Sequence, residues 1–479
     1  MPVRYTRPLD GGWGWAVVLA VFMIGACSFG VIRSFGVFLE EFTTQFDQSA
    51  TATSLVISVC IGIAFGGTLL GVMLSARFGF RPVAMAGGVL AAVGCILTYF
   101  STSIVHLYIT VGVMVGLGSS LAFFPSLSLV GKYFDKKRAI ANGIAVSGPS
   151  VGSMVFPPVF TYLIEEYGWR GSLLIAAGVM LNITAFAALL RPIQLPEKQL
   201  SLPSDRAETT SFSELNEVPQ DRPTVRINEG KSSLSRSHWR TVIAELKALL
   251  TNPRLVSFIT ADMFFLGFGF FIPVVHIAPR ARHLGLEPYQ SAFLVSLIAI
   301  GDVISRFLSG FLPTCRKFRH LHWYTLSLLT TGISSLLSTL AKTYPALAAY
   351  CMVLGLLEGA GLAISLTVLA DLVGPTRLSG AMGLVMLLMS VIVTGAPPIA
   401  GKLYDSTQNY NMSFIVAGCG PIFGGLIAAI LLCFGDENVR RVSERQSPPT
   451  AFVNGARPSS VVKSDDKQLL KPFVIETSV

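Results

Sequence analysis

Charged residues are scarce in this sequence. Of its 479 residues, 13% are Asp, Glu, Lys or Arg and 52% are hydrophobic, whereas soluble globular domains carry roughly 25% charged residues. This composition excludes a soluble enzyme. It also excludes a disordered chain, which has far fewer large apolar side chains. The composition predicts a protein that crosses the membrane several times.

Catalytic and metal-binding motifs are lacking as well. The sequence has no Walker loop and no H-E-x-x-H. Its 7 cysteines occur singly, without a C-x-x-C pair, which argues against a zinc site or a disulfide framework. We therefore expect no enzymatic activity and no cofactor.

Long apolar runs are what the sequence does contain. A helix needs roughly 20 apolar residues to cross the hydrocarbon layer of a membrane. The first run is too long for the core of a signal peptide and has no small-residue cleavage pattern, so it is interpreted as a span. The sequence therefore predicts an all-α membrane protein with 12 transmembrane helices. The predicted spans are 15–39, 53–76, 82–101, 105–130, 139–163, 170–190, 254–278, 290–313, 322–341, 345–373, 380–404 and 412–434.

A polar stretch divides these spans into six and six. Residues 191–253 are rich in Ser, Thr, Pro, Glu, Arg and Lys, a composition that cannot bury enough apolar surface to fold alone. The predicted organisation is a six-helix half over 1–190, a disordered cytoplasmic loop over 191–253, a second six-helix half over 254–434 and a cytoplasmic tail over 435–479.

Lys and Arg are distributed unequally between alternate connections. Cytoplasmic loops of membrane proteins collect these residues, so their distribution predicts that both termini are cytoplasmic. The basic side carries Arg4, Arg7, Arg77, Arg81, Lys132, Lys136, Lys137, Arg138, Arg316, Lys317, Arg319 and Arg377, and the opposite side carries Arg170, Arg280, Arg282, Lys342 and Lys402.

Two six-helix halves around a central loop resemble the major facilitator superfamily, whose halves rock about a site at the membrane midplane. The segment "LSARFGFRP" between the second and third spans is similar to the superfamily's gating loop through Gly79 and Arg81. It departs from that pattern at Ala76, where the usual acidic residue is missing. The resemblance implies a secondary carrier that works by alternating access.

Two stretches are more specific. The first is "DGGWGW" at the start of the first span, and the second is "YFDKKRAIANGIAVSGPSVG", which leads into the fifth span. Together they resemble the signature pair of the monocarboxylate transporter family, solute carrier family 16. "GWRGSLLI" and "DLVGPTRLSGAMGL" are similar to that family too, so the resemblance covers nearly all of residues 10–434. The indole rings fit either a membrane-interface anchor or a role in gating. The first signature consists of Asp10, Gly11, Gly12, Trp13, Gly14 and Trp15.

Asp302 and Arg306 lie inside the eighth span, where an ionisable side chain is costly and marks a functional site by default. Their spacing of four puts them on one face of a helix, roughly 18 Å from the outer end of the span for Asp302. A purely structural ion pair is the alternative. The D-x-x-x-R spacing resembles the pair that binds the carboxylate and relays the proton in proton-coupled members of the family. This resemblance implies that Arg306 holds the substrate carboxylate and that Asp302 is its switchable counter-charge.

Arg33 and Glu358 depart from the family pattern. Arg33 of the first span replaces a lysine of the lactate carriers, and its guanidinium stays charged and offers a planar fork for a carboxylate. Glu358 of the tenth span replaces an aromatic residue, and the glycines at 355, 359 and 361 predict room for a ligand. The alternatives are an Arg33 side chain that reaches the outer surface and a Glu358 that pairs with Arg33 or Arg306.

Asp262 of the seventh span is a secondary candidate site residue. It lies nearer the cytoplasmic end of its span than the other charges. Two roles are open: Asp262 lines the inner vestibule, or it forms hydrogen bonds with neighbouring helices.

These charges predict a site for a zwitterion. Arg33 or Arg306 would hold a carboxylate, and Glu358 would hold a cationic group, through charge-assisted hydrogen bonds. The arginine in the first span resembles the creatine-linked branch of the family, which implies plasma-membrane transport of creatine or a related zwitterion. The alternatives are proton-linked transport of lactate or pyruvate and, from another class, a non-transporting membrane sensor or scaffold.

Protein partners are expected in two places, and no nucleic acid is expected. The family resemblance implies a single-span, immunoglobulin-type chaperone such as basigin. The last residues, Glu476 to Val479, have a hydroxyl two places before a terminal aliphatic side chain. This pattern allows a free C-terminus to add a strand to a PDZ domain, and an inert tail end is the alternative.

Overall fold

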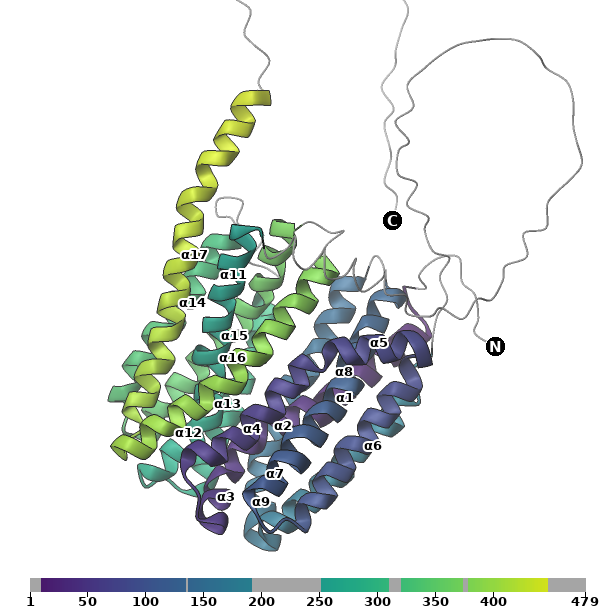
Figure 1. Ribbon diagram of the computed structural model, residues 1–479, viewed down its shortest axis with the longest axis vertical. Coiled ribbons are helices and arrows are strands. Elements are labelled where there is room, and N and C mark those ends of the chain that lie inside the picture. Colours follow the sequence, from purple (N-terminus) through teal and green to yellow (C-terminus); the bar gives the residue numbers. More distant parts are fainter. Residues whose placement is uncertain (1–9, 135–136, 192–250, 310–319, 374–377, 447–479) are drawn as a thin grey trace, which may run out of the picture. The chain divides into compact units, whose positions relative to one another are not determined.

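A computed structural model describes residues 10–134, 137–191, 251–309, 320–373 and 378–446, which are helical apart from short connections (Figure 1). Almost the whole predicted central loop and the terminal PDZ-binding pattern lie outside these residues. Several of the basic residues that predict the orientation lie outside them as well.

The first half of the chain opens with one nearly unbroken helical rod of 34 residues, Trp13–Phe46. The chain then turns at Ser49, whose side chain accepts a hydrogen bond from the Ala52 N–H and so caps the next helix. The elements are α1 (Trp13–Gly25), η1 (Ala26–Gly30), α2 (Val31–Ser34), η2 (Phe35–Phe38), α3 (Leu39–Phe46), α4 (Ala50–Gly66), α5 (Thr68–Phe78), α6 (Phe80–Tyr99), α7 (Ile104–Leu107), η3 (Tyr108–Val115), α8 (Gly116–Tyr133) and α9 (Arg138–Ala187).

The second half is built from similarly long helices. Its last helix continues to Gln446, beyond the predicted span end at residue 434. The elements are α11 (Pro253–Phe264), η4 (Phe265–Phe271), α12 (Ile272–His283), α13 (Pro288–Ser309), α14 (His320–Leu337), η6 (Ser338–Leu340), α15 (Tyr344–Val373), α16 (Leu378–Thr407) and α17 (Asn411–Gln446).

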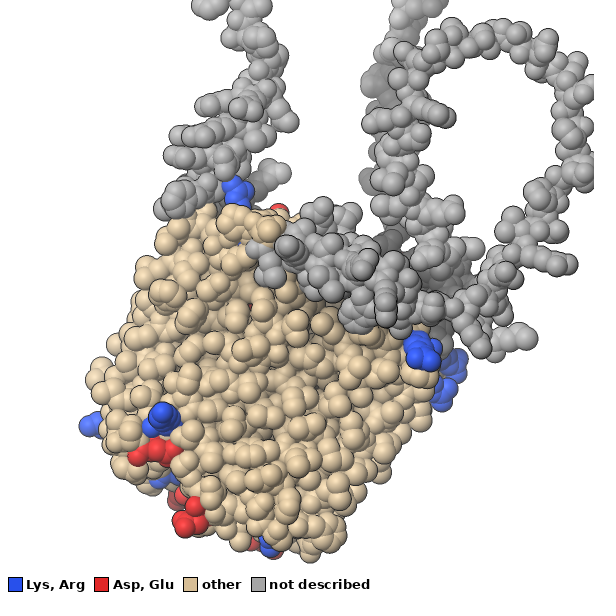
Figure 2. Space-filling model, in the orientation of Figure 1, with Lys and Arg blue, Asp and Glu red and all other residues tan. Residues whose placement is uncertain are grey.

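Nine helices among the described residues are long and apolar enough to cross a membrane, or ten if the bent pair α4 and α5 forms one span. This count takes Ile140–Ala187 as a single span, although Gly168 breaks that stretch with a φ of 69°. The number of twelve spans stays a prediction. Apart from its ends, the visible surface of the described residues carries few charged side chains (Figure 2), as a membrane-facing surface requires.

Arg280 is a basic residue that the sequence places in an outer connection and the structure places inside a helix. Its side chain is 2% exposed because α12 continues to His283. The guanidinium donates hydrogen bonds to the hydroxyl and the carbonyl oxygen of Ser338 and lies over the Phe414 ring. It thereby satisfies a carbonyl at the end of a helix, where cations are favoured.

Helices of the two halves pack directly against each other: α4 lies against α16 (Figure 1), and α9 lies against α13. Asp405 of α16 caps the start of α4: its carboxylate accepts hydrogen bonds from the N–H groups of Ala50 and Thr51 at 2.9 and 3.0 Å. At the same end, Arg282 forms a 3.0 Å ion pair with Glu40. These contacts hold the halves together at the end of the bundle that contains α3.

Glycines set the distance between the first rod and α9. A Cβ atom at Gly152 would lie 2.4 Å from the Ala26 carbonyl oxygen and 2.9 Å from the Gly30 Cα, and a Cβ at Gly30 would lie 2.6 Å from the Gly152 Cα. Only glycine permits this approach of two backbones. The contact fixes where α2 and the middle of α9 lie with respect to each other.

We expect the substitution Gly152→Ala to destabilise the protein by about 1–3 kcal/mol, because the new methyl group meets backbone atoms that cannot move aside. Thermal melting of the purified protein in detergent measures this effect. Gly178→Ala in the same helix is the matched control, since a Cβ there has nothing within 4 Å. Equal melting temperatures for the two variants would contradict this account of the packing.

Candidate substrate-binding site

Asp302 and Arg306 occur in the regular helix α13 and form an ion pair one helical turn apart. Arg306 Nε lies 2.6 Å from Asp302 Oδ1, and Arg306 Nη2 lies 3.1 Å from Asp302 Oδ2. Both oxygens of the carboxylate are therefore engaged by one planar guanidinium, the geometry that gives the strongest pairing. The Asp302 side chain is only 1% exposed.

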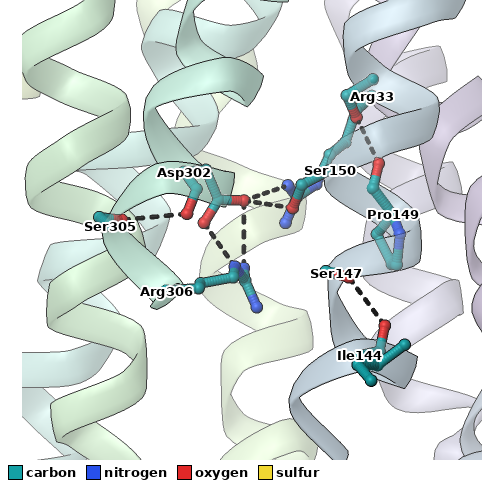
Figure 3. Close-up of polar contacts among 9 residues, drawn as sticks. Arg33, Ile144, Ser147, Pro149, Ser150, Asp302, Ser305 and Arg306 are labelled. Carbon is teal, nitrogen blue, oxygen red and sulfur yellow. Dashed lines mark hydrogen bonds and ion pairs between the residues drawn. The ribbon is translucent and has the colours of Figure 1, made fainter. Parts of the chain in front are cut away.

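The first half of the chain contributes two more donors to the same carboxylate (Figure 3). Arg33 Nη1 of α2 lies 3.4 Å from Asp302 Oδ2, and Ser150 Oγ of α9 lies 2.5 Å from it. The Arg33 guanidinium also lies over the ring of Phe270 from η4, 4.9 Å from the ring centre, which is a cation–π contact. The predicted residues Arg33, Asp302 and Arg306 thus meet at one point between the halves.

Glu358 lies in α15 close to this cluster. Its side chain is 1% exposed, and neither of its carboxylate oxygens has a hydrogen-bond partner among the residues that the structure describes. Arg33, Arg306 and Asp302 are the charged groups that act on it electrostatically. Burying a polar group without a partner is costly, so Glu358 has an unused capacity to accept hydrogen bonds.

The glycines around Glu358 do not leave the predicted room for a ligand. A Cβ at Gly355 would touch the Ile298 carbonyl oxygen, and a Cβ at Gly359 would lie 2.5 Å from Asp302 Oδ1. A Cβ at Gly361 would lie 2.6 Å from the Phe265 ring. The small residues instead let α13 and α15 approach closely, which brings Glu358 next to the Asp302 cluster.

Asp262 lies apart from these charges. It is buried in α11, and its Oδ1 accepts a 2.9 Å hydrogen bond from the hydroxyl of Tyr324 in α14. This contact between helices is one of the two arrangements that the sequence leaves open. Among the residues that the structure describes, Asp262 forms no ion pair.

Sequence reasoning missed Ser150 and Phe270. Serines are frequent in these helices, and most of them bond to a carbonyl of their own helix, as Ser28, Ser34 and Ser58 do. Only the fold shows that the Ser150 hydroxyl bonds to Asp302 in the other half of the molecule. Phe270 is one of many phenylalanines, and nothing in the local pattern distinguishes it.

The two signature stretches meet at the opposite end from α3. The N–H of Asp10 donates to the Tyr133 carbonyl oxygen at 3.1 Å, and the N–H of Lys137 donates to Asp10 Oδ1 at 3.4 Å. The rings of Trp15 and Phe134 are in edge contact at 5.1 Å. Trp13 and Trp15 are 39% and 37% exposed, which suits a membrane-interface position.

Comparisons with known proteins agree with this architecture. Residues 21–314 and 277–475 match the family model described as Major Facilitator Superfamily. The chain is 35% identical to monocarboxylate transporter 13 of Rattus norvegicus over 88% of its length and 90% of that protein. It is 31% identical to monocarboxylate transporter 12 of Homo sapiens over 98% of its length and 91% of that protein.

A solved structure is similar in fold. It is a bacterial homolog of the human lysosomal transporter Spinster in an inward-facing and unoccupied conformation. The TM-score is 0.61 at 16% identity, and the match covers 92% of this chain and 100% of the other. At this identity, the likeness concerns the fold alone.

We expect Asp302→Asn to destabilise the protein by about 3 kcal/mol or more, because it leaves two largely buried guanidiniums with one less negative charge. The double variant Asp302→Asn with Arg306→Gln should recover much of this loss, since it removes one charge of each sign. Thermal melting of the wild type, both single variants and the double variant gives the coupling between the two residues.

The exposed pair of Arg282 and Glu40 provides the control for this cycle. Its side chains are 33% and 48% exposed, so Arg282→Gln and Glu40→Gln should each change stability by about 0–1 kcal/mol, with little coupling. A coupling between Asp302 and Arg306 no larger than this would contradict the strength that we assign to the buried pair.

Proposed function

Because the chain belongs to the monocarboxylate transporter family of the major facilitator superfamily, we propose that it carries creatine or a related zwitterion across the plasma membrane. The family membership confirms the predicted all-α major facilitator fold. The protein is a multi-pass membrane protein and a secondary transporter of small molecules, not an enzyme. The identity of the solute is the proposal.

One observation above all supports a zwitterion: Glu358 is buried beside two arginines, and no residue in the described ranges forms a hydrogen bond with its carboxylate. A guanidinium or ammonium group of a solute would supply the donors that Glu358 lacks, as charge-assisted hydrogen bonds. The carboxylate of the same solute would take donors from Arg33 or Arg306 in place of Asp302. Pyruvate has no hydrogen-bond donor for Glu358, and lactate has only an uncharged hydroxyl group.

Proton-linked transport of lactate or pyruvate is the second candidate. It is supported by the paired contact of Arg306 with Asp302, since a guanidinium fork that fits the Asp302 carboxylate also fits that of a simple acid. A non-transporting sensor is disfavoured, because a scaffold has no need of four ionisable side chains in the membrane interior.

Uptake measurements distinguish these candidates. Cells that express the chain would be given labelled creatine, lactate, pyruvate and amino acids at two pH values, with and without sodium. Creatine uptake above that of a surface-expressed Arg306→Ala variant supports the proposal. Lactate or pyruvate uptake that rises at acidic pH, without creatine uptake, would support the second candidate instead.

The setting in the cell is also part of the proposal. We place both termini in the cytoplasm, with a basigin-type single-span chaperone and a PDZ domain at the C-terminus as partners. The distribution of Lys and Arg supports the orientation, and the membership in this family supports the chaperone. The terminal residues Thr477 and Val479 support the PDZ partner.

We expect Arg306→Lys to reduce uptake at limiting substrate by at least about tenfold, because an ammonium group cannot reproduce the planar, two-point grip of a guanidinium. Initial rates of creatine uptake, normalised to surface expression, measure this loss. Arg282→Lys, in the exposed pair with Glu40, is the matched control and should retain uptake. Full uptake by the Arg306→Lys variant would show that Arg306 does not hold the carboxylate.

We expect Glu358→Gln to weaken the apparent affinity for creatine by about tenfold while changing that for lactate little, because only creatine uses the negative charge. Competition between the two solutes in one variant provides an internal comparison. Asp262→Asn removes a buried carboxyl group outside the site and should affect both solutes alike. Equal losses for creatine and lactate in Glu358→Gln would point to a structural role for Glu358.

A further inference from the structure

Three serines on one stretch of α9 use their hydroxyl groups differently. Ser147 donates to the Ile144 carbonyl oxygen at 2.8 Å, and Ser153 donates to the Pro149 carbonyl oxygen at 2.9 Å. Both bonds stay within α9. Ser150 instead donates to Asp302 Oδ2 on α13, across the boundary between the halves (Figure 3).

The helical periodicity explains why Ser150 points to α13. A Cβ at Gly148 would touch the Phe22 carbonyl oxygen, and a Cβ at Gly152 would lie 2.4 Å from the Ala26 carbonyl oxygen, so these two glycines face the first rod. A residue midway between them lies on the opposite side of a helix with 3.6 residues per turn. Ser150 is therefore held on the face of α9 that meets the second half.

The Ser150 contact is the shorter of the two that Asp302 makes with the first half. The hydroxyl lies 2.5 Å from Asp302 Oδ2, the range of a charge-assisted O–H···O⁻ bond. Arg33 Nη1 lies 3.4 Å from the same oxygen, so its hydrogen bond is longer than usual. Ser150 is fully buried, so water does not compete for its hydroxyl in this state.

We propose that Ser150 is a positioning residue that latches the two halves of the carrier together through Asp302. When the halves separate at the end that contains α3, this bond has to break. Its strength therefore sets part of the balance between the arrangement in which this bond is formed and a state open at that end. The proposal rests on alternating access of the halves, and not on which solute is carried.

Removing the hydroxyl should leave the fold intact. In a Ser150→Ala variant, Asp302 keeps its two hydrogen bonds with Arg306, so no buried charge loses all of its donors. The variant loses only the stabilisation that the hydroxyl gives to the arrangement in which its bond is formed. A hydrogen bond to a charged group corresponds to a shift of about tenfold in such an equilibrium.

The substitution Ala292→Cys provides a thiol that detects the open state. A cavity of about 100 Å³ between the halves is lined by Thr161 of α9, Arg282 of α12 and Ala292 of α13. Ala292 is 1% exposed, so a cysteine there reacts with a maleimide only when this region opens. Purified protein in detergent would be labelled without any solute, and peptide mass spectrometry would report the rate at that cysteine alone.

We expect Ser150→Ala to raise this labelling rate about tenfold over the parent Ala292→Cys protein. Ser153→Ala and Ser147→Ala are matched controls, because their hydroxyl groups bond only within α9, and neither should change the rate. A second comparison uses Ser150→Thr and Ser150→Val, which have the same shape and differ in the hydroxyl. The threonine variant should label more slowly than the valine variant.

The two comparisons decide the proposal. If Ser150→Ala labels no faster than Ser153→Ala, or if the threonine and valine variants label at equal rates, the hydroxyl does not latch the halves. If Ser150→Ala fails to fold, the threonine and valine pair alone gives the answer. Labelling requires no transported solute, so a failure to carry creatine would contradict the proposed function and leave this result unaffected.

Discussion

The structure depends on one buried carboxylate that has to be surrounded by donors. An ionised group in the membrane interior is tolerated only when its acceptors are satisfied by the protein. Asp302 meets this requirement with Arg306 on its own helix and with Arg33 and Ser150 from the other half. The groups that satisfy this carboxylate therefore also join the two halves through a single side chain.

Glycine contacts determine how closely the helices that carry these side chains approach each other. Gly30 and Gly152 bring the first rod against α9 backbone to backbone, and Gly355 and Gly359 bring α15 against α13. The first contact places Arg33 beside Ser150, and the second places Glu358 beside Asp302. Since helices in lipid associate through close packing and not through burial from water, small residues determine where the charged residues lie.

The sequence predicted those features that depend on local pattern. The apolar runs predicted long helices, the four-residue spacing predicted the pair of Asp302 and Arg306, and the rarity of charge in the spans singled out Arg33 and Glu358. Ser150 was not predicted, because a helical serine has a partner in its own helix and only the tertiary fold shows when it uses another. The glycines near Glu358 were misinterpreted as space for a ligand, because a sequence does not show which helix fills the space that a glycine leaves.

The charges of the site also constrain what it can carry. Once the cationic group of a solute supplies donors to Glu358, both carboxylates can be ionised, and Asp302 and Glu358 then balance the two guanidiniums of Arg33 and Arg306. A zwitterion leaves that balance unchanged, whereas a monocarboxylate adds one negative charge in a region of low dielectric constant, where uncompensated charge is costly. A monocarboxylate would therefore have to bring a proton to Glu358 or Asp302, and a zwitterion would not.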